Sequence, residues 1–98
     1  MQFRQGDVLV ERIEAIPEDA KAEIGPVILA HGEATGHAHT IKSRYAKLLS
    51  TGTDRFLRTT KPVRLVHQEH GAIEIPAGEY RVTRQREYSP EAIRNVAD

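Results

Sequence analysis

Residues 46–60 read AKLLSTGTDRFLRTT and predict a β-hairpin. Two runs of strand length, 46–51 and 55–60, flank Gly52, Thr53 and Asp54, whose small polar side chains are typical of a tight connection. The preceding segment repeats this plan, because the apolar run 27–30 and the alternating run 37–43 are separated by a glycine-bounded turn. Two such hairpins in succession indicate a β protein.

The rest of the chain extends the same pattern. Further strands are predicted over residues 8–13, 63–67, 72–75 and 80–88, with glycine- or proline-containing turns between most of them. Helix is expected only as a short turn over 17–24 and at the C-terminus, where Ser89 is a cap and Pro90 a first helical residue. We therefore expect one all-β domain over residues 1–98, a small antiparallel barrel or sandwich with a short C-terminal helix.

The composition excludes several classes of protein. A chain of 98 residues with 39% hydrophobic and 29% charged side chains has enough apolar material to fold. No run approaches the length of a membrane span and the N-terminus lacks the layout of a secretory signal, so a soluble cytoplasmic protein is expected. The absence of cysteine excludes disulfides, thiolate zinc sites, iron–sulfur ligation and thiol nucleophiles.

The net charge of zero is the sum of opposed blocks. Residues 1–33 carry seven acidic and three basic side chains, whereas residues 42–66 carry seven basic side chains and one acidic one. Such blocks could dock a protein partner or a second copy of the chain. A protein interaction or self-assembly module that uses no metal is therefore one hypothesis for the function.

The five histidines are concentrated in two short stretches. His37 and His39 are two residues apart, and alternate side chains of a strand project from the same face, so the two rings can share one ion. His67 and His70 stand at the end of a predicted strand and in the following turn, from which they can supply further ligands. These four residues, His37, His39, His67 and His70, are the predicted metal ligands.

The ligand types indicate a divalent transition metal. Zinc is the first candidate because neutral imidazoles are suitable zinc ligands, and iron, nickel, copper and manganese are alternatives. Glu69 shares the face of His67 if residues 67–69 are extended, and Glu33 could reach the site from the first turn; His31 joins only if it lies close to the others. With one coordination position open, such a site would activate water, which makes a metal-dependent enzyme a third hypothesis.

Other interpretations of these and neighbouring residues stay open. The histidines could lie on the surface without metal, or form a site whose charge switches between about pH 5 and 7. Arg81, Arg84 and Arg86 between Tyr80 and Tyr88 could bind nucleic acid, but the zero net charge favours an edge strand protected by charge. The serines lack a nucleophile-elbow setting, and no phosphate-binding glycine loop is present.

Two resemblances add to these inferences. The segments Gly36-His37-Ala38-His39 and Ile75-Pro76-Ala77-Gly78-Glu79-Tyr80 resemble the cupin pattern, which implies a metal-binding β-barrel in which His67 or His70 stands in for the final histidine. Nearly the whole chain resembles a family of small uncharacterised bacterial proteins. That likeness is carried by Gln5-Gly6-Asp7-Val8-Leu9, by residues 32–39 (GEATGHAH), by His67-Gln68-Glu69-His70 and by residues 76–88 (PAGEYRVTRQREY).

Overall fold

The computed structural model describes residues 1–32 and 36–85, and these residues form strands connected by turns and loops. The strands are β1 (Gln2–Gln5), β2 (Val8–Arg12), β3 (Lys21–Ala22), β4 (Val27–His31), β5 (Ala38–Ile41), β6 (Ala46–Ser50), β7 (Arg55–Thr59), β8 (Val63–Val66), β9 (Ile73–Ile75) and β10 (Gly78–Arg84). The predicted all-β class is confirmed. The predicted C-terminal helix lies outside the described residues.

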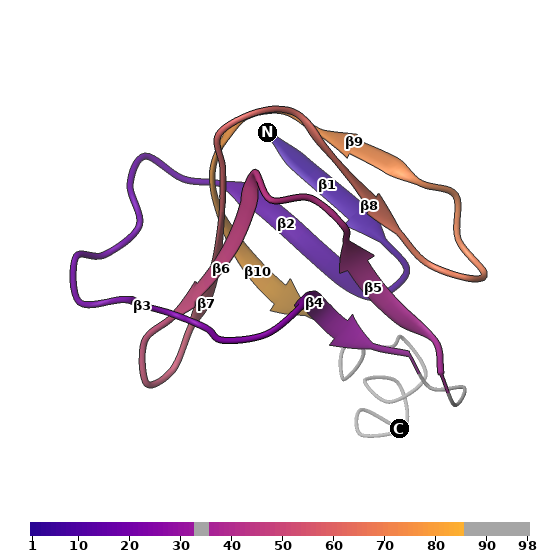
Figure 1. The fold of residues 1–98 in the computed structure, drawn as a ribbon, viewed down its shortest axis with the longest axis horizontal. Coiled ribbons are helices and arrows are strands. Elements are labelled where there is room, and N and C mark those ends of the chain that lie inside the picture. The colour runs from indigo at the N-terminus through magenta and orange to yellow at the C-terminus, as the bar shows by residue number, and fades with distance from the viewer. Residues whose placement is uncertain (33–35, 86–98) are drawn as a thin grey trace, which may run out of the picture.

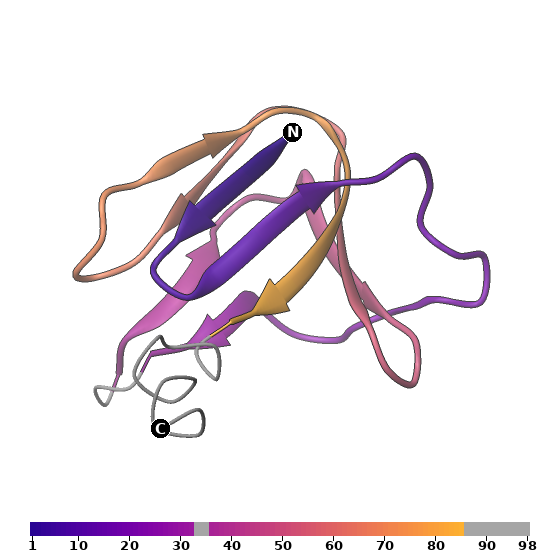
Figure 2. The same cartoon turned by 180° about the vertical axis from the view of Figure 1, so that it is seen from behind.

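Two antiparallel sheets make up the fold (Figure 1). The six-stranded sheet has the order β1-β2-β10-β7-β6-β3, and the four-stranded sheet has the order β4-β5-β8-β9. Strand β1 contacts β9 and strand β4 contacts β6, so both edge strands of the four-stranded sheet lie against the six-stranded sheet. Figure 2 shows β1, β2 and β10 side by side in the six-stranded sheet.

The predicted hairpins pair in the expected way. Strands β6 and β7 pair around the connection at residues 51–54, and β4 pairs with β5 with one irregularity in register after Ile28. The main core lies between the sheets, and its fully buried members include Val10, Leu57, Leu65 and Tyr80. The Tyr80 hydroxyl donates a hydrogen bond of 2.6 Å to the Pro76 carbonyl, so this buried aromatic ring keeps a polar partner.

A second, smaller core corrects the helical turn expected over residues 17–24. Ile16, Leu49 and Phe56 pack together, and the long connection between β2 and β3 supplies the first of them. Residues 21–22 then pair with β6 as strand β3 instead of continuing a helix. The turn signal of Pro17 produces only a tight turn, closed by a 3.1 Å bond from the Ala20 amide to the Pro17 carbonyl. No helix in residues 1–32 and 36–85 is long and apolar enough to cross a membrane.

Candidate functional site

The register of the four-stranded sheet brings the two histidine stretches together. Thr40 lies opposite Val66 and Ile41 opposite Leu65 in the antiparallel pair β5–β8. Continuing that register past the strand ends places His39 opposite His67 and His37 opposite Glu69. Residues directly opposite in an antiparallel pair share a face of the sheet, and Ile41 and Leu65 are buried in the core. The histidine side chains therefore continue the inner face of this sheet toward one end of the molecule.

The side chain of Gln68 holds these two segments together beyond the last strand pairs. Its Oε1 accepts a 2.9 Å hydrogen bond from the Ala38 amide, and its Nε2 donates a 3.2 Å bond to the Gly36 carbonyl. An amide side chain thus replaces the backbone ladder where the chain turns away. This contact keeps the segment that carries His37 and His39 beside the segment that carries His67.

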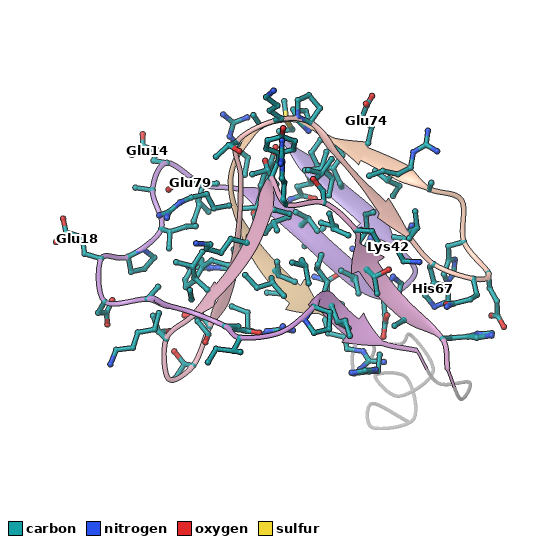
Figure 3. The ribbon with its side chains drawn as sticks, in the orientation of Figure 1. Glu14, Glu18, Lys42, His67, Glu74 and Glu79 are labelled. Atoms are coloured by element: carbon teal, nitrogen blue, oxygen red, sulfur yellow. The ribbon has the colours of Figure 1, made fainter. Side chains whose placement is uncertain are left out.

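All four histidines predicted as ligands lie close together. Ring centroids are 4.3 Å apart for His39 and His67, 4.7 Å for His67 and His70, 5.7 Å for His37 and His67, and 5.8 Å for His39 and His70. His39 is 2% exposed, whereas His70 is on the surface. We call these four residues the histidine cluster. Figure 3 shows its member His67 just after the end of β8.

The other candidate residues have different positions. Glu69 Oε2 lies 3.2 Å from His37 Nδ1, so this carboxylate stands at the exposed rim of the histidine cluster. His31 is exposed at the end of β4, and within the described chain its ring contacts none of the other imidazoles. Glu33 lies outside the described residues.

Gln5 was not predicted as a site residue, yet it determines the state of His39. This side chain is 2% exposed, and its Nε2 donates to the carbonyls of Leu65 and Gly71 at 3.0 and 2.9 Å. Because both carbonyls accept, the amide oxygen must face His39 Nδ1, which lies 2.9 Å away. Neutral His39 therefore carries its proton on Nδ1, and its Nε2 presents a lone pair.

Asp7 was also missed, and it faces that lone pair. Its Oδ1 is 3.7 Å from His39 Nε2, while its Oδ2 accepts a 2.8 Å hydrogen bond from Arg84 Nε. Partial burial alone would raise the pKa of Asp7, but the hydrogen bond from Arg84 and the positive charge of Arg84 hold this pKa below its usual value. Burial lowers the pKa of His39 to about 4, and the neighbouring His67 ring acts in the same direction. At neutral pH a carboxylate thus faces an unprotonated imidazole nitrogen.

His67 has the opposite tautomer to His39. Its Nδ1 accepts a 3.0 Å hydrogen bond from the Glu69 amide, so the neutral ring carries its proton on Nε2. Partial burial lowers the pKa of His67, and the His70 and His37 rings lower it further. Within residues 1–32 and 36–85, no group of three or more histidine, aspartate or glutamate side chains has the geometry to hold a metal ion as it stands.

Two glycines leave the space that the rings occupy. A Cβ on Gly6 would lie 2.8 Å from His70 Nε2 and 3.3 Å from His39 Cε1. A Cβ on Gly32 would lie 2.9 Å from His37 Cβ and 3.0 Å from His67 Nε2. Contacts shorter than 3.0 Å are essentially never seen for real Cβ atoms, so a larger residue would displace the end of the His70 side chain at Gly6 and the His37 side chain at Gly32.

Comparison with known proteins identifies the family of the chain without identifying an activity. A family model described as a domain of unknown function, DUF8820, matches residues 4–85, and the chain belongs to this family. Comparison with curated proteins and with solved structures gave no match.

Proposed function

We propose that this member of the DUF8820 family binds one divalent transition-metal ion with the histidine cluster. The single observation that carries the proposal is the convergence of four imidazole rings, from two segments about 30 residues apart, at one end of the two sheets. Imidazole nitrogens are common ligands of zinc and its neighbours in the first transition series. Buried His39, whose outward nitrogen is unprotonated at neutral pH, would be the innermost ligand.

Ligation requires side-chain movement, in particular of His67. His67 would have to release the Glu69 amide or turn about χ2 to present a lone pair beside those of its neighbours. Rotation of a histidine ring about χ2 is soft compared with movement of a strand, and His67 and His70 are not fully buried. The backbone positions of the cluster therefore suit a metal site, and the side chains would complete it as the ion binds.

The number of protein ligands would determine what the ion does. Four ligands close a tetrahedral shell and favour a structural role, whereas three leave a position for water and favour hydrolytic or redox chemistry. Zinc is the first candidate, and iron, nickel, copper and manganese stay open. The proposal includes a cytoplasmic location and, where a coordination position stays open, a cupin-like, metal-dependent barrel enzyme.

The metal-free interaction module stays a prediction with less support. One contact already joins the opposed charge blocks inside the chain, because Arg55 donates to both Glu23 carboxylate oxygens at 2.9 Å. The Arg55 side chain also donates to the carbonyls of Ile28 and Leu29, at 3.0 and 2.7 Å. This part of the charge pattern has a role within the fold, without an external partner.

Metal content tests the proposal directly. Protein purified without a polyhistidine tag should contain, or take up, about one zinc ion per chain, as measured by elemental analysis and by titration against a chromophoric chelator. His39→Ala should abolish this binding, and His31→Ala is the matched control because its ring stands outside the cluster. The proposal is wrong if binding stays below about a tenth of an ion per chain, or if both variants bind like the wild type.

A further inference from the structure

The turn between β1 and β2 forms a third side of the histidine cluster. It carries Gln5 and Asp7 on either side of Gly6, whose φ of +60° is a conformation that favours glycine. Gln5 reaches into the four-stranded sheet, because it bonds Leu65 in β8, Gly71 in the following loop and His39 in β5. One buried side chain thus ties together all three segments around the rings.

The separation of Asp7 and His39 fits two ligands of one metal ion. In neutral His39, Gln5 holds the proton on Nδ1, and the unprotonated Nε2 lies 3.7 Å from Asp7 Oδ1. A metal cation between these two atoms would be attracted to both of them. Two ligand atoms that each lie about 2.0–2.2 Å from one tetrahedral ion are about 3.4 Å apart, which is close to the separation found here.

Arg84 fixes the orientation of the carboxylate. Its Nε donates to Asp7 Oδ2 at 2.8 Å, and the Gln85 amide donates to the Asp7 carbonyl at 2.8 Å. Oδ2 is therefore occupied by Arg84 at the end of β10, while Oδ1 is the oxygen that lies 3.7 Å from His39 Nε2. Metal-binding carboxylates and imidazoles are commonly oriented by such hydrogen bonds from their outer atoms.

We infer that Asp7 is an anionic ligand of the metal ion, bound through Oδ1 beside His39 Nε2, and that Gln5 and Arg84 are positioning residues that aim these two atoms. The inference rests on the proposed function and changes its ligand set from imidazoles alone to imidazoles with one carboxylate. A carboxylate reduces the net charge of the bound centre by one. It also suits harder ions such as manganese and ferrous iron better than an all-imidazole set does.

Asp7→Asn is the direct test, because the amide keeps the size of the side chain and an oxygen for Arg84. Zinc affinity, measured by competition with a chromophoric chelator, should fall by about ten- to a hundredfold. Asp19→Asn is the matched control, since Asp19 is an exposed carboxylate in the β2–β3 connection, and its affinity should not change. The visible spectrum of the cobalt-substituted protein should change in Asp7→Asn alone, because a lost ligand alters the d–d bands.

The outcomes separate this inference from the proposed function. A wild type that binds neither zinc nor cobalt overturns both. A wild type that binds, with equal affinity or an unchanged cobalt spectrum in Asp7→Asn, leaves the proposed function standing and overturns the role of Asp7 as a ligand. If Asp7→Asn does not fold, carboxyl ¹³C NMR of the wild type tests whether Asp7 binds the metal ion. Saturating zinc should shift the carboxyl ¹³C resonance of Asp7 and leave that of Asp19 in place, and equal behaviour of the two overturns the inference.

Discussion

Replacing Gln5 with alanine should be among the most destabilising polar substitutions in the chain. The change removes three hydrogen bonds at once, to Leu65 O, Gly71 O and His39 Nδ1. The acceptor at Gly71 is on the surface and regains water, but the ring of His39 is 2% exposed and its Nδ1–H is left without a partner. An unsatisfied buried donor costs about 1–3 kcal/mol and each lost bond about 1 kcal/mol, so we expect a loss of about 3 kcal/mol.

Urea unfolding followed by far-UV circular dichroism, at pH 7 and with a chelator present, measures this loss. The midpoint should fall while the slope stays the same, because the surface exposed on unfolding is unchanged. Gln68→Ala is the matched control: it also removes two cross-segment bonds, but from an exposed side chain, and should cost less than about 1 kcal/mol. If Gln5→Ala loses no more stability than Gln68→Ala, our account of Gln5 as the buried organiser of the cluster is wrong.

Two further predictions concern the histidine cluster, and a third concerns the ion pair of Glu79 with Arg58. Gly32→Ala should weaken zinc binding at least about tenfold and cost about 1–2 kcal/mol of stability, because the new Cβ would crowd His37 and His67. Gly52→Ala is the control: its Cβ meets open space, so neither zinc binding nor stability should change. In the metal-free protein, ¹⁵N NMR of the imidazoles should show His39 protonated on Nδ1 and His67 on Nε2, and the reverse pattern would contradict the assigned roles of Gln5 and of the Glu69 amide. Glu79→Gln should cost about 1 kcal/mol at pH 7, because Glu79 accepts bonds from the Ile16 amide and Arg58. These bonds lower the pKa of Glu79, so its carboxylate stabilises the fold above pH 4.5. The difference in stability between Glu79→Gln and the wild type should therefore close as the pH falls below that value. A gap between the two urea midpoints that persists at low pH would exclude the carboxylate as its source.

Local sequence signals predicted the elements that depend on neighbours in the chain. The β6–β7 hairpin follows from two strand-like runs around small polar residues, and the β4–β5 hairpin from glycines that bound a turn. Strand β1 was missed because its four residues, Gln2–Gln5, show too short and too polar a pattern to stand out. It forms an edge of the six-stranded sheet by pairing with β2 alone, and that pairing is supplied by the tertiary structure.

In the candidate site, too, the sequence predicted only what depends on neighbours in the chain. The spacing of His37 and His39 placed both rings on one face of a strand, and the structure has both beside His67. Pairing of β5 with β8 could not be read from the sequence, since β6 and β7 intervene between them and pair in the other sheet. Gln5 and Asp7 were missed for a similar reason: polar residues on either side of a glycine are the ordinary composition of a turn. Tertiary contacts bring them to the rings, among them the contact of β1 with β9 and the bonds of Gln5 to Leu65 and Gly71.

The inner face of the four-stranded sheet changes from apolar to polar over two steps along the strands. Ile41 and Leu65 are core residues, His39 and His67 follow them, and His37 and Glu69 stand at the rim. A buried, hydrogen-bonded polar pair contributes little net stability, since its desolvation offsets most of the gain, and well-packed apolar side chains would serve a core at least as well. Packing therefore gives no reason for a buried Gln5–His39 pair that directs a lone pair at a carboxylate. A cation bound between His39 Nε2 and Asp7 Oδ1 would give this buried pair a role, because both atoms would then be ligands of one ion.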